Sequence, residues 1–282
     1  MLSTGIKIFV GVVLAALLVY LVFAGFAWKY QERMAFPGAR GALPFPATLG
    51  IPDGQMITVQ AEDGVTLHGW YLPPSPAPQD DSTAPGLLWF YGNMETIEGI
   101  APVLRDFRPP GIGTLVLDYR GYGSSEGEPT EAGVYLDAEA AWDFLVRRPE
   151  IDSTRIAVYG RSIGSAVALY LASERPVKAV VLDSPFTSGR DMANEHYSFL
   201  PTSLVRLSLD NVGRAGRLAA PLLVFHGTED WIAPIEMARS VAEAGHAEEL
   251  IEIEGAGHND TYSIGGAMYR ERFHGFLNAH LR

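Results

Sequence analysis

Five short, continuous apolar runs recur along the chain, and this repetition constrains its fold more than any other feature. Runs of this kind are typical of strands that are buried on both faces of a parallel sheet. They lie at Gly86–Tyr91, Gly113–Asp118, Arg155–Tyr159, Val177–Asp183 and Pro221–His226. Helical patterns separate them, as at Glu131–Arg148, where apolar side chains recur with a helical period. The alternation predicts an α/β fold with a mostly parallel, doubly wound sheet.

Further elements are expected at both ends of this pattern. Met56–Gln60 and Thr66–Leu72 flank the dipeptide Asp63-Gly64, which favours a tight turn and therefore predicts an antiparallel N-terminal hairpin. Glu249–Ile253 is expected to form the last strand. The remaining helices are expected at Ser165–Glu174, Pro234–Ala244 and Tyr269–Leu281.

The N-terminal segment differs from everything that follows it. No residue from Ile8 to Trp28 is charged, and an apolar run of about 20 residues is long enough to cross a bilayer as a helix. A cleaved signal peptide has a shorter apolar region, of about 7–15 residues, before a small-residue site, for which Gly25 and Ala27 are a weak match. We therefore expect an uncleaved transmembrane helix, with a cleaved signal or a buried core helix as alternatives.

The charges around this run point in both directions. Lys7 and the amino terminus favour a cytoplasmic N-terminus, whereas Lys29, Arg33 and Arg40 favour the opposite. Because a short tail, one span and a large domain are the usual layout of a signal anchor, we expect a single-pass protein with its domain outside the cytoplasm, in a periplasmic or extracellular location. The predicted boundaries are a membrane anchor over 1–30, a Gly- and Pro-rich linker or strap over 31–55, and the α/β domain over 56–282, with a small cap at about 186–220.

The charge and cysteine content exclude several classes of protein. The 282 residues include 33 acidic and 21 basic side chains, for a formal net charge of −12, and the sequence has no basic run. Since phosphate groups are bound by clustered lysine and arginine, we expect no nucleic-acid partner. The chain has no cysteine, which rules out disulfides, thiolate metal sites and cysteine nucleophiles.

One serine stands in the setting of a catalytic nucleophile. Gly160-Arg161-Ser162-Ile163-Gly164 matches the pattern G-x-S-x-G, which by itself is weak because five-residue patterns occur by chance. Here a predicted strand ends directly before it and a small-residue helix begins at Ser165, which is the strand–turn–helix context that the pattern requires. The two glycines leave room for a tight, strained turn. We therefore expect Ser162 to be a nucleophile rather than an ordinary helix cap.

A nucleophilic serine needs a base, and the base needs an acid that orients it. His258 lies on a Gly-rich loop after the last predicted strand, where it can swing over the carboxyl ends of the strands, so it is the expected base. Asp230 follows the next-to-last buried strand and gives the chain order serine, aspartate, histidine. Asp183 and Glu229 remain as alternative acids.

The oxyanion of such a reaction is stabilised by two backbone N–H groups. One is expected from Ile163, directly after the nucleophile. The other is expected from the loop after Gly86–Tyr91, where Gly92 permits a tight turn. Asn93 is therefore the first candidate for the second donor, and Met94 is the next.

These segments together resemble the serine hydrolases of the α/β-hydrolase superfamily, and within it the BEM46-like and ABHD13-like group, with a hydrolase domain of the serine aminopeptidase S33 type. The resemblance extends from about Met56 to the C-terminus, and its segments are Trp89–Asn93, Asp118–Gly127, Gly160–Gly164, Asp183–Phe186, His226–Asp230 and Gly255–His258. One departure is Tyr91, where the family usually has histidine; the backbone role of Asn93 survives this change. The resemblance implies the α/β-hydrolase fold, the triad and, in many members, an N-terminal membrane anchor.

The combined pattern predicts a membrane-anchored serine hydrolase that cleaves carboxylic ester or thioester bonds through an acyl-enzyme intermediate. An apolar stretch at Phe186–Ala220 is expected to cover the site, which favours a small-molecule or lipid-like acyl substrate. No metal or organic cofactor is needed for this chemistry. One alternative is an aminopeptidase or amidase, in which Asp183 or Glu95 would hold the substrate ammonium. The other is a non-catalytic membrane scaffold, which the presence of all three triad residues disfavours.

Overall fold

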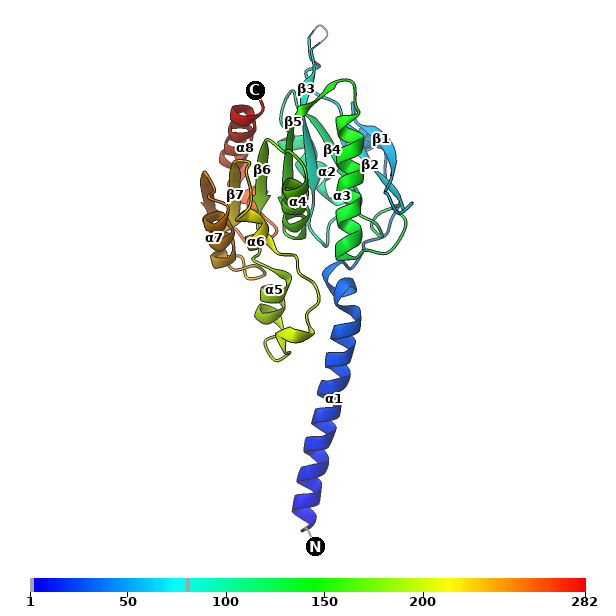
Figure 1. Ribbon diagram of the computed structural model, residues 1–282, viewed down its shortest axis with the longest axis vertical. Coiled ribbons are helices and arrows are strands. Elements are labelled where there is room, and N and C mark those ends of the chain that lie inside the picture. Colours follow the sequence, from blue (N-terminus) through cyan, green and yellow to red (C-terminus); the bar gives the residue numbers. More distant parts are fainter. Residues whose placement is uncertain (1–2, 80–81) are drawn as a thin grey trace.

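The computed structural model describes residues 3–79 and 82–282. Within them, eight strands form one sheet in the order β1-β2-β4-β3-β5-β6-β7-β8 (Figure 1). The strands are β1 (Gln55–Gln60), β2 (Thr66–Leu72), β3 (Ala84–Phe90), β4 (Gly113–Leu117), β5 (Ile151–Arg161), β6 (Ala179–Asp183), β7 (Leu222–Gly227) and β8 (Glu249–Ile253). β2 pairs antiparallel with β1 and β4, and all other neighbours are parallel. The predicted mixed, mostly parallel sheet with an antiparallel N-terminal hairpin is confirmed.

Helices cover both faces of this sheet. α2 (Ile97–Phe107) and α8 (Thr261–His280) lie together, because the Phe107 ring contacts the rings of Tyr262 and Tyr269. α3 (Glu131–Val146), α4 (Ile163–Glu174) and α7 (Ile235–Ala244) pack over the other face (Figure 1). Every residue of β4, β6 and β7 is buried, as expected for strands between two helical layers.

The predicted cap region holds three short helices between β6 and β7. They are α5 (Gly189–His196), the 3₁₀ helix η2 (Thr202–Leu204) and α6 (Asn211–Ala215). α6 packs against α4 and α7, and so belongs to the helical layer of the domain. α5 and η2 instead extend beyond the carboxyl ends of the strands, toward the N-terminal helix (Figure 1).

The N-terminal helix α1 (Thr4–Ala35) projects from the domain as a single long rod (Figure 1). Only 6% of its most apolar stretch is buried, so the alternative that this segment is a core helix is wrong. Its 32 residues give a length of about 48 Å, enough for a single-pass membrane anchor. α1 also continues through residues 31–35 of the predicted strap, after which η1 (Pro46–Leu49) is the one helical turn before β1.

Two helices differ from the sequence-based expectation. A helical stretch is expected between the first two apolar runs, but without bounds; α2 occupies this place, and its buried side chains Ile97, Ile100 and Leu104 follow a helical period. α8 begins at Thr261, eight residues before the expected start at Tyr269. The early turns of α8 contain two adjacent glycines, which disfavour a helix, and the backbone is kinked at the second of them, Gly266, with φ 48°.

Candidate active site

Ser162 occupies a strained turn between β5 and α4. Its backbone has φ 51° and ψ −119°, a conformation that costs a residue with a side chain about 1–3 kcal/mol. The turn is held in place because the Ser162 N–H donates to the Asp183 carbonyl of the neighbouring strand at 2.9 Å. Strain of this kind is what presents a side chain at the first turn of the following helix, at the carboxyl edge of the sheet.

The two glycines that flank this serine are required by close backbone contacts. A Cβ atom at Gly160 would lie 2.3 Å from the Gly164 carbonyl oxygen, and one at Gly164 would lie 2.2 Å from the Phe90 carbonyl oxygen. Both distances are far below van der Waals contact. The steric reason that the sequence pattern implied is therefore present, and it arises from the packing of β5, α4 and β3.

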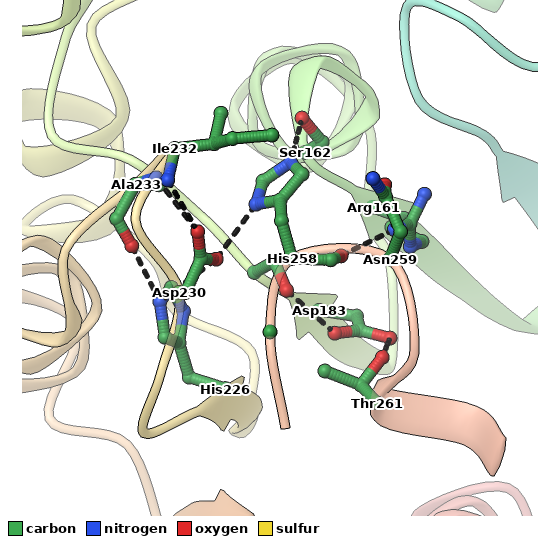
Figure 2. Close-up of polar contacts among 12 residues, drawn as sticks. Arg161, Ser162, Asp183, His226, Asp230, Ile232, Ala233, His258, Asn259 and Thr261 are labelled. Carbon is green, nitrogen blue, oxygen red and sulfur yellow. Dashed lines mark hydrogen bonds and ion pairs between the residues drawn. The ribbon is translucent and has the colours of Figure 1, made fainter. Parts of the chain in front are cut away.

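The structure brings the three expected triad residues together (Figure 2). His258 lies on the Gly-rich loop after β8, and its Nε2 is 2.8 Å from the Ser162 hydroxyl oxygen. Its Nδ1 is 2.6 Å from Oδ2 of Asp230. If Nδ1 carries the proton that Asp230 accepts, Nε2 has a free lone pair directed at the serine hydroxyl. This geometry is the one in which a histidine can remove a proton from serine.

Asp230 is fixed and kept ionised by the loop that follows β7. Its Oδ1 accepts hydrogen bonds from the N–H groups of Ile232, at 2.9 Å, and Ala233, at 2.8 Å (Figure 2). Burial alone would raise the pKa of this carboxyl. The hydrogen bond and charge of His258, together with the Ala233 N–H, outweigh burial and hold the pKa of Asp230 below its ordinary value.

Neither alternative acid reaches the histidine. The Asp183 carboxylate is fully buried and accepts from the hydroxyls of Thr261, Tyr269 and Ser184 instead. Burial raises the pKa of Asp183. Glu229 is exposed on the loop next to Asp230. Of the three carboxylates, only Asp230 is therefore in a position to orient His258.

The second histidine near this site supports the acid loop. His226, the penultimate residue of β7, is fully buried, and its Nε2 lies 2.8 Å from the Ala233 carbonyl, to which it can donate. Burial is the largest influence on the pKa of His226 and lowers it, which favours the neutral imidazole.

The expected oxyanion donors lie on two elements that meet at Ser162. Ile163 is the first residue of α4, where a backbone N–H has no acceptor within its own helix. In the loop after β3, the N–H of Gly92 is engaged by Glu95 Oε2 at 2.6 Å, which leaves Asn93 and Met94 as candidates. The Asn93 carbonyl accepts from the Tyr122 hydroxyl at 2.9 Å, so the backbone of this residue is held in place.

The unusual tyrosine in this loop points into the domain. The Tyr91 hydroxyl donates to Oδ1 of Asp118 at 2.9 Å, and the Ile97 N–H donates to the same oxygen at 3.1 Å. Tyr91 is 1% exposed and is not among the residues that line the cavity at the site. It therefore stabilises the start of α2 from within the core.

Arg161 links the loops of the site, which the sequence pattern did not indicate. Its side chain is 2% exposed and donates to Glu95 Oε1 at 2.6 Å. It also donates to the His258 carbonyl and to the Asn259 side chain, the latter at 3.0 Å (Figure 2). One buried guanidinium thus joins the loop of the expected oxyanion donors to the loop of the expected base. Although burial disfavours its charge, the attraction of Glu95 prevails and raises the pKa of Arg161.

A cavity of about 370 Å³ opens beside Ser162 and His258. Most of the residues around it are apolar, and the cap supplies many of them, among them Phe186, Met192, Leu200, Val205 and Leu207. Residues of α1 complete the wall. Within residues 3–79 and 82–282, no group of three or more histidine or acidic side chains is arranged to hold a metal ion.

Comparisons with known proteins bear on the family and the fold. The sequence profile of a family described as "Serine aminopeptidase, S33" matches residues 86–208. An uncharacterized protein of Mycobacterium tuberculosis is 36% identical over 256 residues, covering 89% of each chain. Protein bem46 of Schizosaccharomyces pombe is 31% identical over 235 residues, covering 78% of this chain and 77% of that one. Among solved structures, the esterase Pf2001 of Pyrococcus furiosus superposes with a TM-score of 0.70 at 21% identity, over 87% of this chain and 97% of that one.

Proposed function

We propose that this chain is a membrane-anchored serine hydrolase of carboxylic esters or thioesters. The premise is that the chain belongs to the BEM46-like group of α/β-hydrolases. The observation that carries this proposal is the contact chain from Ser162 through His258 to Asp230, with distances of 2.8 and 2.6 Å. The strained backbone of Ser162 supports it, since strain of this kind is retained where it serves a site.

The reaction would proceed in two acyl-transfer steps. Nε2 of His258 takes the proton from Ser162 as its oxygen attacks the substrate carbonyl, and Asp230 balances the charge of the resulting imidazolium. The leaving group receives that proton, and an acyl-enzyme remains. A water molecule then attacks the acyl-enzyme in the same way, with His258 as the base, and the acid is released. The N–H groups of Ile163 and Asn93 would stabilise each oxyanion, and removing one such donor typically lowers kcat by a factor of about 10²–10³.

The environment of the site favours esters over peptides. An aminopeptidase needs a free carboxylate to hold the ammonium group of its substrate. Glu95 is already paired with Arg161 and with the Gly92 N–H, and Asp183 is sealed in the core. The cavity is lined mainly by apolar side chains, which suit an acyl chain better than a charged terminus.

The membrane assignment is supported by α1, whose apolar stretch lies outside the core of the domain. We propose that α1 is an uncleaved single-pass anchor and that the domain lies outside the cytoplasm. Protease treatment of sealed vesicles with the cytoplasmic face outward tests this topology. The domain should be protected and should become digestible only when detergent opens the vesicles; digestion in intact vesicles would place it in the cytoplasm.

Paired substrates test the reaction itself. The full chain in detergent should hydrolyse nitrophenyl butyrate, and Ser162→Ala should reduce this rate to the level of buffer. The matched nitroanilide should react at least about 100-fold more slowly, because nitroaniline is a poorer leaving group than nitrophenol. A faster reaction with an aminoacyl nitroanilide would favour the aminopeptidase, and no hydrolysis of either substrate would favour the scaffold.

A further inference from the structure

The C-terminal part of α1 forms one wall of the cavity beside the nucleophile. Ala27, Gln31 and Met34 lie on one face of the helix, and all three line this cavity. At the end of α1, the Ala35 carbonyl accepts a hydrogen bond from the Asn93 side chain at 3.1 Å. The apolar helix is therefore part of the site and also contacts the loop of an expected oxyanion donor.

The cap is fastened to the same helix near the domain. The Gln31 side chain donates to the Leu204 carbonyl at 3.3 Å and accepts from the Arg206 N–H at 2.6 Å. The Arg206 guanidinium lies over the ring of Trp28, 4.8 Å from its centre. Trp28 ends the uncharged run of α1, so both the tryptophan and the arginine suit the boundary between lipid and water.

A second set of contacts lies farther along α1, toward its N-terminus. The rings of Phe23 and Phe199 are 5.6 Å apart, and the Tyr20 hydroxyl donates to the Phe199 carbonyl at 3.2 Å. With a rise of 1.5 Å per residue, Phe23 lies about 8 Å and Tyr20 about 12 Å beyond Trp28 along the helix. If Trp28 marks the bilayer surface, the tip of the cap that carries Phe199 lies below that surface, within the hydrocarbon.

The composition of this tip fits such a position. The segment Tyr197–Val205 contains no charged residue, and the chain becomes charged again at Arg206. Phe199 is 57% exposed in the absence of lipid, although it is a large apolar side chain at the end of a loop. Tyr197 and Leu200 from this tip line the same cavity as Ser162. The cavity therefore reaches from the nucleophile to the segment that would lie in the bilayer.

We propose that this cavity opens into the membrane leaflet between α1 and the cap, and that the enzyme takes its ester from a lipid that resides in the same bilayer. This inference rests on the proposed hydrolase function and adds the class of substrate, a membrane-resident acyl ester. The volume of about 370 Å³ is at the lower end of the range for small-ligand sites, about 300–1,000 Å³. It suits an ester group with part of one chain, while the rest of the lipid stays between α1 and the cap.

Delivery of the substrate separates this route from uptake through water. In one arrangement, the full chain is reconstituted into phosphatidylcholine vesicles that contain methylumbelliferyl palmitate. In the other, the full chain is reconstituted into vesicles without the ester, and these are mixed with protein-free vesicles that contain it. We expect hydrolysis to be at least about tenfold faster when enzyme and palmitate share a bilayer, because the ester then reaches the site without crossing water. The acetate ester, which dissolves in water, serves as the reference. Equal palmitate rates in both arrangements, with the acetate hydrolysed, would overturn this inference alone. Hydrolysis of neither ester would overturn the proposed function as well.

A matched pair of tryptophan substitutions tests the role of α1. Ala27→Trp places a large ring in the cavity wall, and we expect the palmitate-to-acetate rate ratio to fall at least about tenfold. Ala15→Trp makes the same change at an exposed position of α1 that lies about 18 Å farther toward the N-terminus and does not line the cavity, so it should leave the ratio as in the wild type. Fluorophosphonate labelling of Ala27→Trp reports whether its site is assembled. An unchanged ratio in a labelled Ala27→Trp protein would contradict the assigned route.

The immersion of the cap can be measured independently of activity. Because the chain has no cysteine, Phe199→Cys provides a single attachment point for an environment-sensitive fluorophore. Spin-labelled phosphatidylcholine should quench the fluorophore at position 199. It should not quench one introduced by Ser153→Cys, at the exposed start of β5. Absence of quenching at 199 would show that the tip stays in water and would overturn the proposed route.

Discussion

Replacement of Arg161 by methionine, which keeps the length of the side chain but removes its charge and donors, should loosen both loops of the site. Arg161→Met leaves the Glu95 carboxylate without its cation and the His258 carbonyl without a donor. Breaking a buried ion pair by removing one partner costs about 3–5 kcal/mol. Since the Glu95 side chain is 24% exposed and can be rehydrated, we expect the lower end of this range, about 3 kcal/mol.

Calorimetry and kinetics together measure this effect. For a chain of this size, a loss of about 3 kcal/mol lowers Tm by about 6–12 °C. Displacement of the His258 loop by about 1 Å can reduce kcat about 100-fold. We expect the loss in kcat with little change in KM for a short ester, because Arg161 positions the base and the oxyanion loop rather than the acyl group. Arg161→Lys should recover part of kcat, since the ammonium can still attract Glu95.

A surface arginine gives the matched control for this substitution. Arg105 on α2 pairs with Asp106, and both side chains are about half exposed. Arg105→Met should leave both Tm and kcat unchanged, because exposed ion pairs contribute little. If Arg161→Met also melts within about 1 °C of the wild type and keeps its kcat, then the two loops are not held in place by Arg161.

Three further predictions concern Asp230, Asp118 and Gly164. Asp230→Asn should lower kcat by about 10³–10⁴ while the protein stays folded, because an amide facing Nδ1 favours the wrong histidine tautomer; a rate near that of the wild type would contradict the role of Asp230. Burial raises the pKa of Asp118 to about 6. The carboxyl therefore keeps its proton in the folded protein at a pH where the unfolded chain has lost it. As a result, the free energy of unfolding falls as pH rises from about 4 to about 6. In urea unfolding, the free energy of unfolding of Asp118→Asn relative to that of the wild type should therefore increase by about 2–3 kcal/mol across that interval. A difference that stays constant with pH would argue against the raised pKa. Gly164→Ala should lower the free energy of unfolding by at least about 3 kcal/mol in the same assay, because the new methyl group clashes with the Phe90 carbonyl. Gly275→Ala, which has open space around it in α8, should raise the free energy of unfolding by up to about 1 kcal/mol. Equal effects of the two substitutions would contradict the steric role of Gly164.

The parts of the fold that sequence could predict are those in which one local pattern has one structural meaning. The apolar runs between helical patterns predicted the parallel strands in their order along the chain, and Asp63-Gly64 predicted the hairpin. The contact between Ser162 and His258 also follows, although 96 residues separate them, because both come after strands whose carboxyl ends lie at the same edge. Chain order and sheet topology therefore sufficed to select these residues.

Other features depend on tertiary contacts that leave no local signal. Arg161 occupies a variable position of the pentapeptide, and its partners lie 66 to 98 residues away in two different loops. A buried arginine of this kind cannot be told from a solvated one by its neighbours in sequence. The face of α1 toward the cavity is hidden for a different reason. Because the helix is uncharged on all sides from Ile8 to Trp28, no polar face marks the side that contacts the cap there.

Covalent labelling reports on the nucleophile role proposed for Ser162 at the serine itself. The full chain in detergent is treated with a fluorophosphonate, digested and analysed by mass spectrometry. The adduct should be found on the peptide that carries Ser162, and Asp230→Asn or His258→Ala should slow its formation. A protein that remains unlabelled, or one whose labelling persists in Ser162→Ala, would contradict the role proposed for Ser162.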